Sequence, residues 1–137
     1  MSKPAAPEIL CLGCVGVGKT SLIKQLKQLG RSAAAAASAA AEPEEPTVGV
    51  ELDRMTLGDR TAVVVREVGA AMMATWPSYV PACRCLMFVV DRSNHAQLAS
   101  AAAELHKLIA LLPAATPVAV VLNKCDRPEV RRAMCRH

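Results

Sequence analysis

Five runs of strand-like residues stand out when the apolar and polar positions of the chain are followed in order. Three of them, Glu8–Leu12, Leu86–Val90 and Pro117–Leu122, are short and almost continuously apolar, which predicts strands buried on both faces of a sheet. The other two, Val48–Leu57 and Thr61–Val68, are separated by a short Gly-Asp-Arg turn and predict an antiparallel hairpin. The pattern therefore predicts five strands, which could form one sheet.

Amphipathic stretches with helical spacing lie between these strands. Over residues 22–29, leucine and isoleucine recur at helical intervals, and we expect Gly30 to end this helix as a C-terminal cap. A second predicted helix begins at Asn94, which could form a capping pair with Gln97, and stops at Pro113. Strands that alternate with helices predict an α/β fold, with a mostly parallel sheet and helices on both of its faces.

Polar and low-complexity segments mark the limits of the folded part. Residues 1–7 contain two prolines and no periodicity, so we expect a disordered lead. Residues 31–46 are nearly all alanine and then acidic and proline-rich, which predicts a mobile surface insertion. We expect one domain over 8–130. The basic tail over 131–137 is either a solvated end or a weak contact for anionic lipid or an acidic partner.

Composition narrows the class of protein. Of the 137 residues, 53% are apolar and only 2% are aromatic, so we expect a single aliphatic core. No apolar run has the length of a membrane span and no secretory leader follows Met1, so we expect a soluble, cytoplasmic protein. The net charge of +4 is not accompanied by a basic face with aromatic residues, which argues against nucleic acid as a partner. The six cysteines lack zinc-site spacing and are expected to be free thiols.

A glycine-rich turn between the first strand and the first helix carries the clearest chemistry. Its sequence, Gly-Cys-Val-Gly-Val-Gly-Lys-Thr over residues 13–20, fits the phosphate-binding pattern G-x-x-x-x-G-K-[ST]. Glycines let backbone N–H groups face a phosphate, and the helix N-terminus adds its dipole. Lys19 is expected to reach the phosphates and Thr20 to ligate Mg²⁺. The alternative to a phosphate-binding loop is a glycine-rich turn that matches the pattern by chance. The residues expected to bind phosphate are Gly13, Val15, Gly16, Val17, Gly18, Lys19, Thr20 and Ser21.

A second polar motif, Asn123-Lys124-Cys125-Asp126, follows the last predicted strand and indicates the base. A carboxylate at Asp126 can accept hydrogen bonds from the ring N1–H and the exocyclic amine of guanine, and adenine lacks that ring donor. We therefore expect Asn123, Lys124 and Asp126 to bind a guanine nucleotide. The alternative is an Asn-Lys turn followed by an aspartate that caps a last helix.

Taken together, these motifs resemble those of a Ras-superfamily GTPase of the ADP-ribosylation-factor-like branch. The resemblance implies the small G-protein fold of the P-loop NTPases, with GTP or GDP and Mg²⁺ as cofactors and with effector and regulator proteins as partners. The supporting segments span residues 8 to about 130: Gly13 to Thr20, Pro46-Thr47-Val48-Gly49, Glu67-Val68-Gly69, Trp76-Pro77-Ser78-Tyr79, Leu86 to Asp91 and Asn123 to Asp126.

The resemblance also implies roles for residues in two switch segments. Thr47 matches the threonine that ligates Mg²⁺ and senses the γ-phosphate. Glu67 stands where the family has an aspartate that holds the Mg²⁺ shell through water, and Gly69 follows it at the nucleotide. Ala70 and Ala71 depart from the family, because they replace a glycine and the glutamine that orients the hydrolytic water. We therefore expect GTP binding with very slow intrinsic hydrolysis and a damped switch.

The ends of the sequence depart from the family as well. After Asp126 the family's last strand and C-terminal helix have no counterpart, and we expect a truncated form rather than a gap that a partner covers. Ser2 stands where relatives often carry a myristoylated glycine, so we expect no strong membrane anchor. We expect a monomer. Two other functions stay open: a degenerate, non-catalytic interaction protein with a GTPase fold, and a P-loop kinase.

Overall fold

A single mixed sheet organises the computed structural model, which describes residues 6–30, 45–58, 61–128 and 130. Within these residues the strand order is β2-β3-β1-β4-β5, and every neighbouring pair is parallel except β2 and β3. The predicted α/β fold with one antiparallel hairpin is confirmed. The strands are β1 (Glu8–Leu12), β2 (Val50–Leu57), β3 (Thr61–Val68), β4 (Cys85–Asp91) and β5 (Val118–Asn123).

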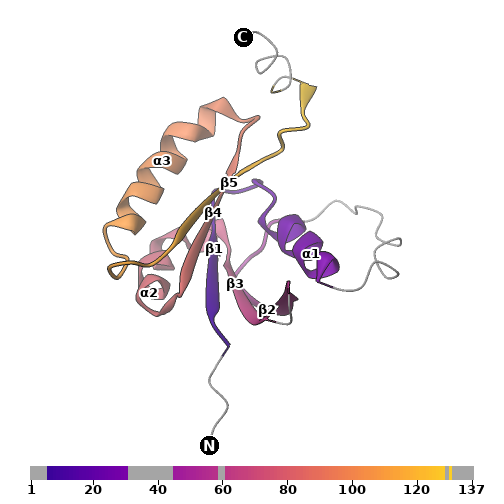
Figure 1. The fold of residues 1–137 in the computed structure, drawn as a ribbon. Coiled ribbons are helices and arrows are strands. Elements are labelled where there is room, and N and C mark those ends of the chain that lie inside the picture. Colours follow the sequence, from indigo (N-terminus) through magenta and orange to yellow (C-terminus); the bar gives the residue numbers. More distant parts are fainter. Residues whose placement is uncertain (1–5, 31–44, 59–60, 129, 131–137) are drawn as a thin grey trace, which may run out of the picture.

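Helices cover both faces of this sheet, as Figure 1 shows, with α1 on one side and α2 and α3 on the other. No helix in the described ranges is long and apolar enough to cross a membrane. The predicted disordered lead and alanine-rich insertion lie mostly outside the described residues, and the basic tail lies wholly outside them. The helices are α1 (Lys19–Leu29), α2 (Trp76–Tyr79) and α3 (His95–Ile109), with 3₁₀ turns η2 (Ala70–Thr75) and η3 (Val80–Ala82).

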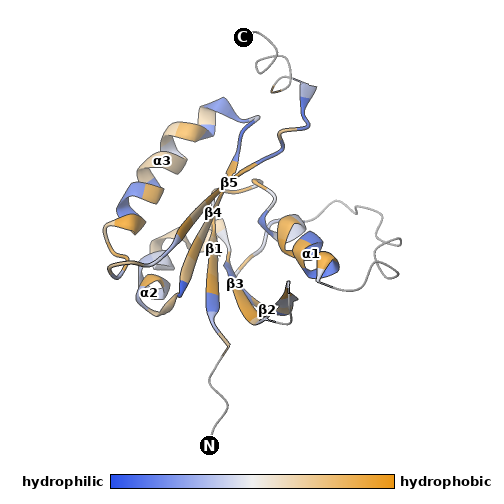
Figure 2. Ribbon diagram, in the orientation of Figure 1, coloured by the Kyte–Doolittle hydropathy of each residue, from blue (hydrophilic) through white to orange (hydrophobic). Residues whose placement is uncertain are grey.

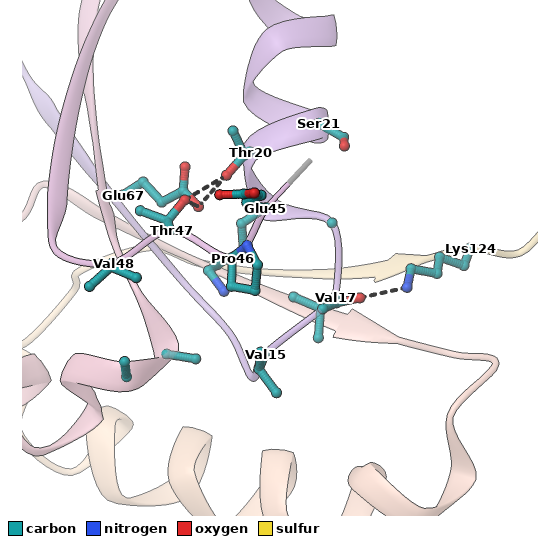
Figure 3. Close-up of a pocket in the computed structure, with 15 residues that line it drawn as sticks. Val15, Val17, Thr20, Ser21, Glu45, Pro46, Thr47, Val48, Glu67 and Lys124 are labelled. Atoms are coloured by element: carbon teal, nitrogen blue, oxygen red, sulfur yellow. Dashed lines mark hydrogen bonds between the residues drawn. The ribbon is translucent and has the colours of Figure 1, made fainter. Parts of the chain in front are cut away.

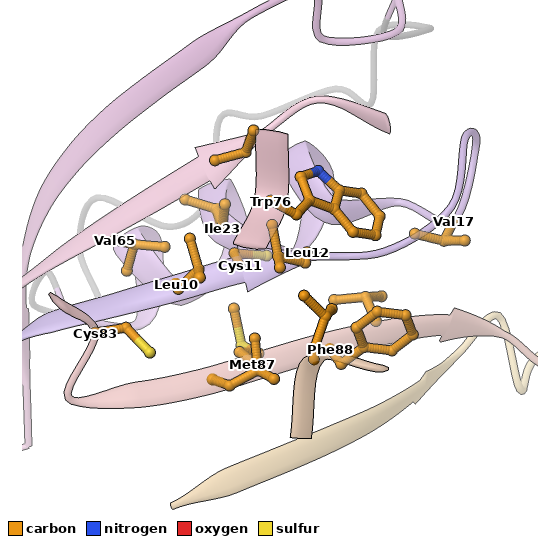
Figure 4. Close-up of a cluster of buried hydrophobic side chains, with 14 of the residues drawn as sticks. Leu10, Cys11, Leu12, Val17, Ile23, Val65, Trp76, Cys83, Met87 and Phe88 are labelled. Atoms are coloured by element: carbon orange, nitrogen blue, oxygen red, sulfur yellow. The ribbon is translucent and has the colours of Figure 1, made fainter. Parts of the chain in front are cut away.

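The core lies between the central strands and these helices, and it is largely aliphatic as expected. In the hydropathy colouring of Figure 2, the central strands carry the most continuous apolar segments. Trp76 and Phe88 are the largest fully buried side chains, and their rings meet edge to face with centroids 6.3 Å apart. Figure 4 shows the two rings in one buried cluster with Leu10 and Leu12 of β1 and Val65 of β3.

The prediction that the last apolar run is a buried strand is wrong. On β5, the side chains of Val118, Val120 and Leu122 are 37%, 48% and 52% exposed. β5 is the edge of the sheet: β4 pairs with one side of it, and no described strand pairs with the other. An apolar run encodes a strand through its own side chains, but its burial depends on the neighbours that cover it.

Of the two expectations about helix ends, one is confirmed and one is wrong. Gly30 is the C-terminal cap of α1 as predicted, and its backbone is right-handed, with φ −74° and ψ −11°. The position suits glycine because a Cβ there would overlap the carbonyl oxygen of Thr56 on β2. Asn94 precedes α3, but its side chain makes no capping hydrogen bond within the described residues.

Candidate functional site

A cavity of about 280 Å³ opens beside the turn between β1 and α1. It lies at the carboxyl ends of the parallel strands, where ligands bind in open α/β sheets. Four separate parts of the sequence meet there, as Figure 3 shows: the glycine-rich turn, the segment before β2, the end of β3 with the first residues of η2, and Lys124 after β5.

The glycine-rich turn follows the buried end of β1 and leads directly into α1. Gly18, the residue before α1, has φ +91°, a left-handed conformation that L side chains rarely adopt. A Cβ on Gly18 would also lie only 2.5 Å from the Asn123 amide nitrogen. Both the backbone conformation and the close approach of a second segment therefore require glycine here.

Lys19 is the buried cation of the site. Its side chain is only 7% exposed, and its ammonium donates hydrogen bonds to the carbonyl oxygens of Gly13 and Cys14 at 2.9 and 3.1 Å. Burial lowers the pKa of Lys19, while the charge of Glu67 opposes that shift. Lys19 is thus held against the turn itself, at the floor of the cavity.

Three oxygen atoms gather near the start of α1, where the side chains of Thr20, Thr47 and Glu67 meet. The Thr20 hydroxyl donates to Glu67 Oε1 at 2.8 Å, and the Thr47 hydroxyl donates to the same oxygen at 3.2 Å. The two hydroxyl oxygens also lie within hydrogen-bond distance of each other, at 2.9 Å, but each hydroxyl has one proton, so only two of these three contacts can be hydrogen bonds at a time. Figure 3 shows the three side chains converging from α1, from the segment before β2 and from β3.

The carboxylate in this group is almost completely buried. Glu67 is 2% exposed, and its Oε2 has no hydrogen-bond partner among the described residues. Burial raises the pKa of Glu67, and the hydrogen bonds from Thr20 and Thr47 together with the charge of Lys19 act against this. A buried carboxylate oxygen without a partner is costly unless a ligand completes the site. Hydroxyl and carboxylate oxygens are the ligands that Mg²⁺ prefers, so these residues fit that ion.

The last residue of β5 and the residue that follows it hold the turn in place. Asn123 Nδ2 donates to the carbonyl oxygen of Val17 at 2.9 Å, and Lys124 Nζ donates to that of Gly16 at 2.5 Å. Lys124, whose backbone is left-handed with φ 59°, also forms an ion pair with Asp91 at 2.9 Å. Burial alone would raise the pKa of Asp91, but hydrogen bonds from Ser93 and Lys124 hold it below its ordinary value.

Comparison with known proteins identifies this arrangement. The sequence pattern of the ADP-ribosylation factor family matches residues 2–135. The chain belongs to this family. The resemblance inferred from the motifs is therefore confirmed.

Two curated human relatives are similar over most of this chain. ADP-ribosylation factor-like protein 16 is 34% identical over 120 residues, which are 87% of this chain and 60% of the relative. ADP-ribosylation factor-like protein 9 is 32% identical over 133 residues, which are 92% of this chain and 65% of the relative. The chain thus spans less than two thirds of the length of these two family members.

A solved structure has the same fold. The Arl6 BBS3 small GTPase from Trypanosoma brucei, determined with the bound nucleotide analogue GppNp, superposes with a TM-score of 0.59. The match covers 77% of this chain and 55% of that one. At 23% sequence identity the likeness shows the fold alone.

The cavity unites most of the residues expected at the nucleotide, but not all of them. Gly13, Gly69 and Asn123 do not line the cavity, and Gly69 is held by hydrogen bonds to Gly49 and Trp76. Asp126 is exposed and does not line the cavity. Those that line it are Val15, Gly16, Val17, Gly18, Lys19, Thr20, Ser21, Thr47, Glu67 and Lys124.

Some contacts to the site have no signal in the sequence pattern. Gln97, expected to cap α3, instead donates its side-chain amide to the carbonyl oxygen of Val15 at 3.1 Å. The ion pair between Asp91 and Lys124 joins residues that end two different strands. The parallel register of β4 and β5, which places Asp91 beside Asn123, could have indicated this pair only once the strand order was known.

Proposed function

We propose that this chain binds GTP and GDP together with Mg²⁺ in the cavity beside the glycine-rich turn. On this proposal it acts as a regulatory switch with weak or absent intrinsic hydrolysis. The observation that carries the proposal is the convergence of Lys19, Thr20, Thr47 and Glu67 on one cavity in a member of the ADP-ribosylation factor family. These residues come from three distant parts of the sequence and supply both a cation for phosphate and oxygens for a metal.

Different groups of the chain would contact the phosphates, the metal ion and the base. The N–H groups of the turn and the N-terminus of α1 would face the phosphates, and Lys19 would exchange its carbonyl partners for phosphate oxygens. Thr20, Thr47 and Glu67 would hold Mg²⁺, which supplies charge neutralisation at the phosphates when bound. Asn123 and Lys124 would support the turn, and Asp126 would read guanine after a rearrangement that brings it to the base.

Weak hydrolysis follows from the two alanines that line the cavity. The side chains of Ala70 and Ala71 are methyl groups, which can neither accept nor donate a hydrogen bond to an attacking water. Water orientation by a side chain is one of the few contributions that a GTPase makes to the chemical step. We expect a single-turnover assay to give slower hydrolysis than in a family member with glutamine, and Ala71→Gln to raise the rate.

A second candidate function is a non-catalytic interaction protein that keeps the fold without needing nucleotide. One observation favours it: Lys19, Asn123 and Lys124 all donate to carbonyl oxygens of the turn, so these side chains are satisfied without a ligand. In either case we propose effectors and regulators, rather than nucleic acid, as partners. The contacts would be made by residues 47–57 and the start of η2, in a cytoplasmic monomer.

Nucleotide content and competition separate these functions. The purified chain is denatured and its bound nucleotide identified by chromatography, and a fluorescent GDP analogue is then titrated with and without Mg²⁺. We expect bound guanine nucleotide, release on chelation of Mg²⁺, and competition by GTP but not by ATP. Lys19→Ala should abolish binding, whereas Lys107→Ala, whose side chain is 68% exposed on α3, is the matched control.

Each contrary result has a distinct meaning. Equal competition by ATP would favour a P-loop kinase, and absence of any bound nucleotide would favour the interaction protein. Binding that survives Lys19→Ala would contradict the placement of the phosphates.

A further inference from the structure

The oxygens of Thr20, Thr47 and Glu67 form a small triangle. Its three sides are 2.9 Å between the hydroxyl oxygens, 2.8 Å from Thr20 to Glu67 Oε1, and 3.2 Å from Thr47 to Glu67 Oε1. All three residues line the same cavity. The carboxylate therefore touches both hydroxyls directly, without an intervening atom.

Two of these sides, 2.8 and 2.9 Å, are close to the spacing of ligand oxygens around a small divalent cation, and the third, 3.2 Å, is slightly longer. Mg²⁺ takes oxygens at about 2.0–2.1 Å in a near-regular octahedron, so neighbouring ligand oxygens are about 2.8–3.0 Å apart. Ca²⁺ takes them at about 2.3–2.6 Å, which would separate neighbours by about 3.3–3.7 Å in the same geometry. The same distances are those of the hydrogen bonds that join the three side chains, so the spacing alone does not identify an ion. It shows instead that Glu67 Oε1 lies close enough to both hydroxyl oxygens for all three to be ligands of one ion. A bound ion would replace these hydrogen bonds, and the hydroxyl protons would then point away from it.

The position of Glu67 in the sheet explains why its carboxylate reaches this far. Its backbone is held between two strands, with Cys11 of β1 and Glu51 of β2 as register partners. A strand paired on both sides cannot retreat, so the extra methylene of glutamate, relative to aspartate, carries the carboxylate toward Thr20. Its second oxygen, Oε2, is buried and has no partner among the described residues, which leaves further lone pairs inside the site.

We propose that Glu67 is a direct ligand of the divalent cation, bound through its carboxylate oxygen rather than through water. This inference rests on the proposed function, and it assigns Glu67 a different role from the water-mediated one that the family resemblance implies. Thr20, Thr47 and Glu67 then occupy three of about six positions around the ion, and Glu67 replaces one water. A charged ligand in place of a neutral one strengthens retention of the metal and with it the nucleotide.

The test counts the water molecules on the metal. Mn²⁺, which also prefers octahedral oxygen ligands, is loaded with a non-hydrolysable GTP analogue, and its bound waters are counted by electron paramagnetic resonance in ¹⁷O-labelled water. With two phosphate oxygens on the ion, the wild-type chain should carry about one water, and a carboxylate outside the shell would leave about two. Glu67→Asp should gain one water and release nucleotide at a higher Mg²⁺ concentration during titration with a chelator.

Glu51→Asp is the matched control, because it shortens the exposed glutamate opposite Glu67 on β2 and should leave the count unchanged. A count of about two waters in the wild-type chain, with the analogue bound, overturns the direct ligand and leaves the proposed function standing. Failure of the wild-type chain to retain the analogue overturns both. Because the wild-type count needs no variant, it decides the question even if Glu67→Asp does not fold.

Discussion

The contact between Gly18 and Asn123 makes a prediction about how two distant segments depend on each other. Gly18→Ala places a methyl group at φ +91°, which costs about 1–2 kcal/mol for an L residue in a left-handed conformation. The same methyl group would lie 2.5 Å from Asn123 Nδ2 and would push the amide away from the Val17 carbonyl oxygen. Loss of that 2.9 Å hydrogen bond costs about 1 kcal/mol more.

The expected magnitudes follow from counting that hydrogen bond once. Gly18→Ala alone should lower the free energy of unfolding by about 2–3 kcal/mol, and Asn123→Ala alone by about 1 kcal/mol. In the double variant the bond can be lost only once, so the total should stay near about 2–3 kcal/mol. The coupling energy of the double-mutant cycle is then about 1 kcal/mol, above the additivity limit of about 0.3–0.5 kcal/mol for independent sites.

Urea unfolding without nucleotide measures these values, because a bound ligand would add its own stabilisation. The chain has one tryptophan, and Trp76 is fully buried, so its fluorescence reports unfolding. Gly16→Ala is the matched control: Gly16 has φ +72°, but no described atom lies within 4 Å of a Cβ there. That variant should be additive with Asn123→Ala. Additivity for Gly18→Ala as well, or equal coupling for both glycines, would refute the reasoning.

Three further predictions concern the core, the ion pair between Asp91 and Lys124 beside the site, and the end of α1. Trp76→Ala, at a fully buried side chain, should cost about 3–5 kcal/mol in circular-dichroism melts, and Trp76→Phe clearly less; equal costs would contradict the packing argument. Because the folded pKa of Asp91 is lowered, it stabilises the fold above the unfolded pKa, and this contribution is lost as pH falls through the folded pKa. The difference in free energy of unfolding between wild type and Asp91→Asn, measured by urea titration, should therefore shrink below about pH 4. A difference that stays constant with pH would count against the ion pair with Lys124. Gly30→Ala should lower the urea midpoint, at a cost of about 1–3 kcal/mol, because its methyl group overlaps a backbone oxygen of Thr56; an unchanged midpoint would show that the turn shifts freely.

Local pattern was sufficient for the elements and for the residue types of the site. The strand at Thr61–Val68 has the predicted bounds, and the glycine-rich turn lies between β1 and α1 as its sequence requires. Strand alternation, helical spacing and the glycines of a turn depend on neighbours within a few residues. For this reason these features could be predicted from the sequence alone.

The pattern was insufficient wherever the outcome depended on residues far away in sequence. Val120 belongs to an apolar strand and is nevertheless 48% exposed, because β5 is at the edge of the described sheet and its burial depends on which elements pack against it. Gln97 suits a helix cap, but its amide reaches a carbonyl oxygen 82 residues away. Long-range hydrogen bonds compete with local ones, and the composition of a helix start does not reveal which of them forms.

The amino-acid sequence specified a phosphate-binding turn, a guanine motif and the two alanines that replace the residues of hydrolysis, because each is a matter of residue type at a fixed spacing. Only folding brought Thr20, Thr47 and Glu67 within 2.8–3.2 Å of one another, across as many as 47 residues of chain. Those distances depend on the register of β3 against β1 and β2 and on the length of one side chain. Residue types indicated the class of ligand that we propose, and the packed sheet determined how closely the Glu67 carboxylate approaches the two hydroxyls.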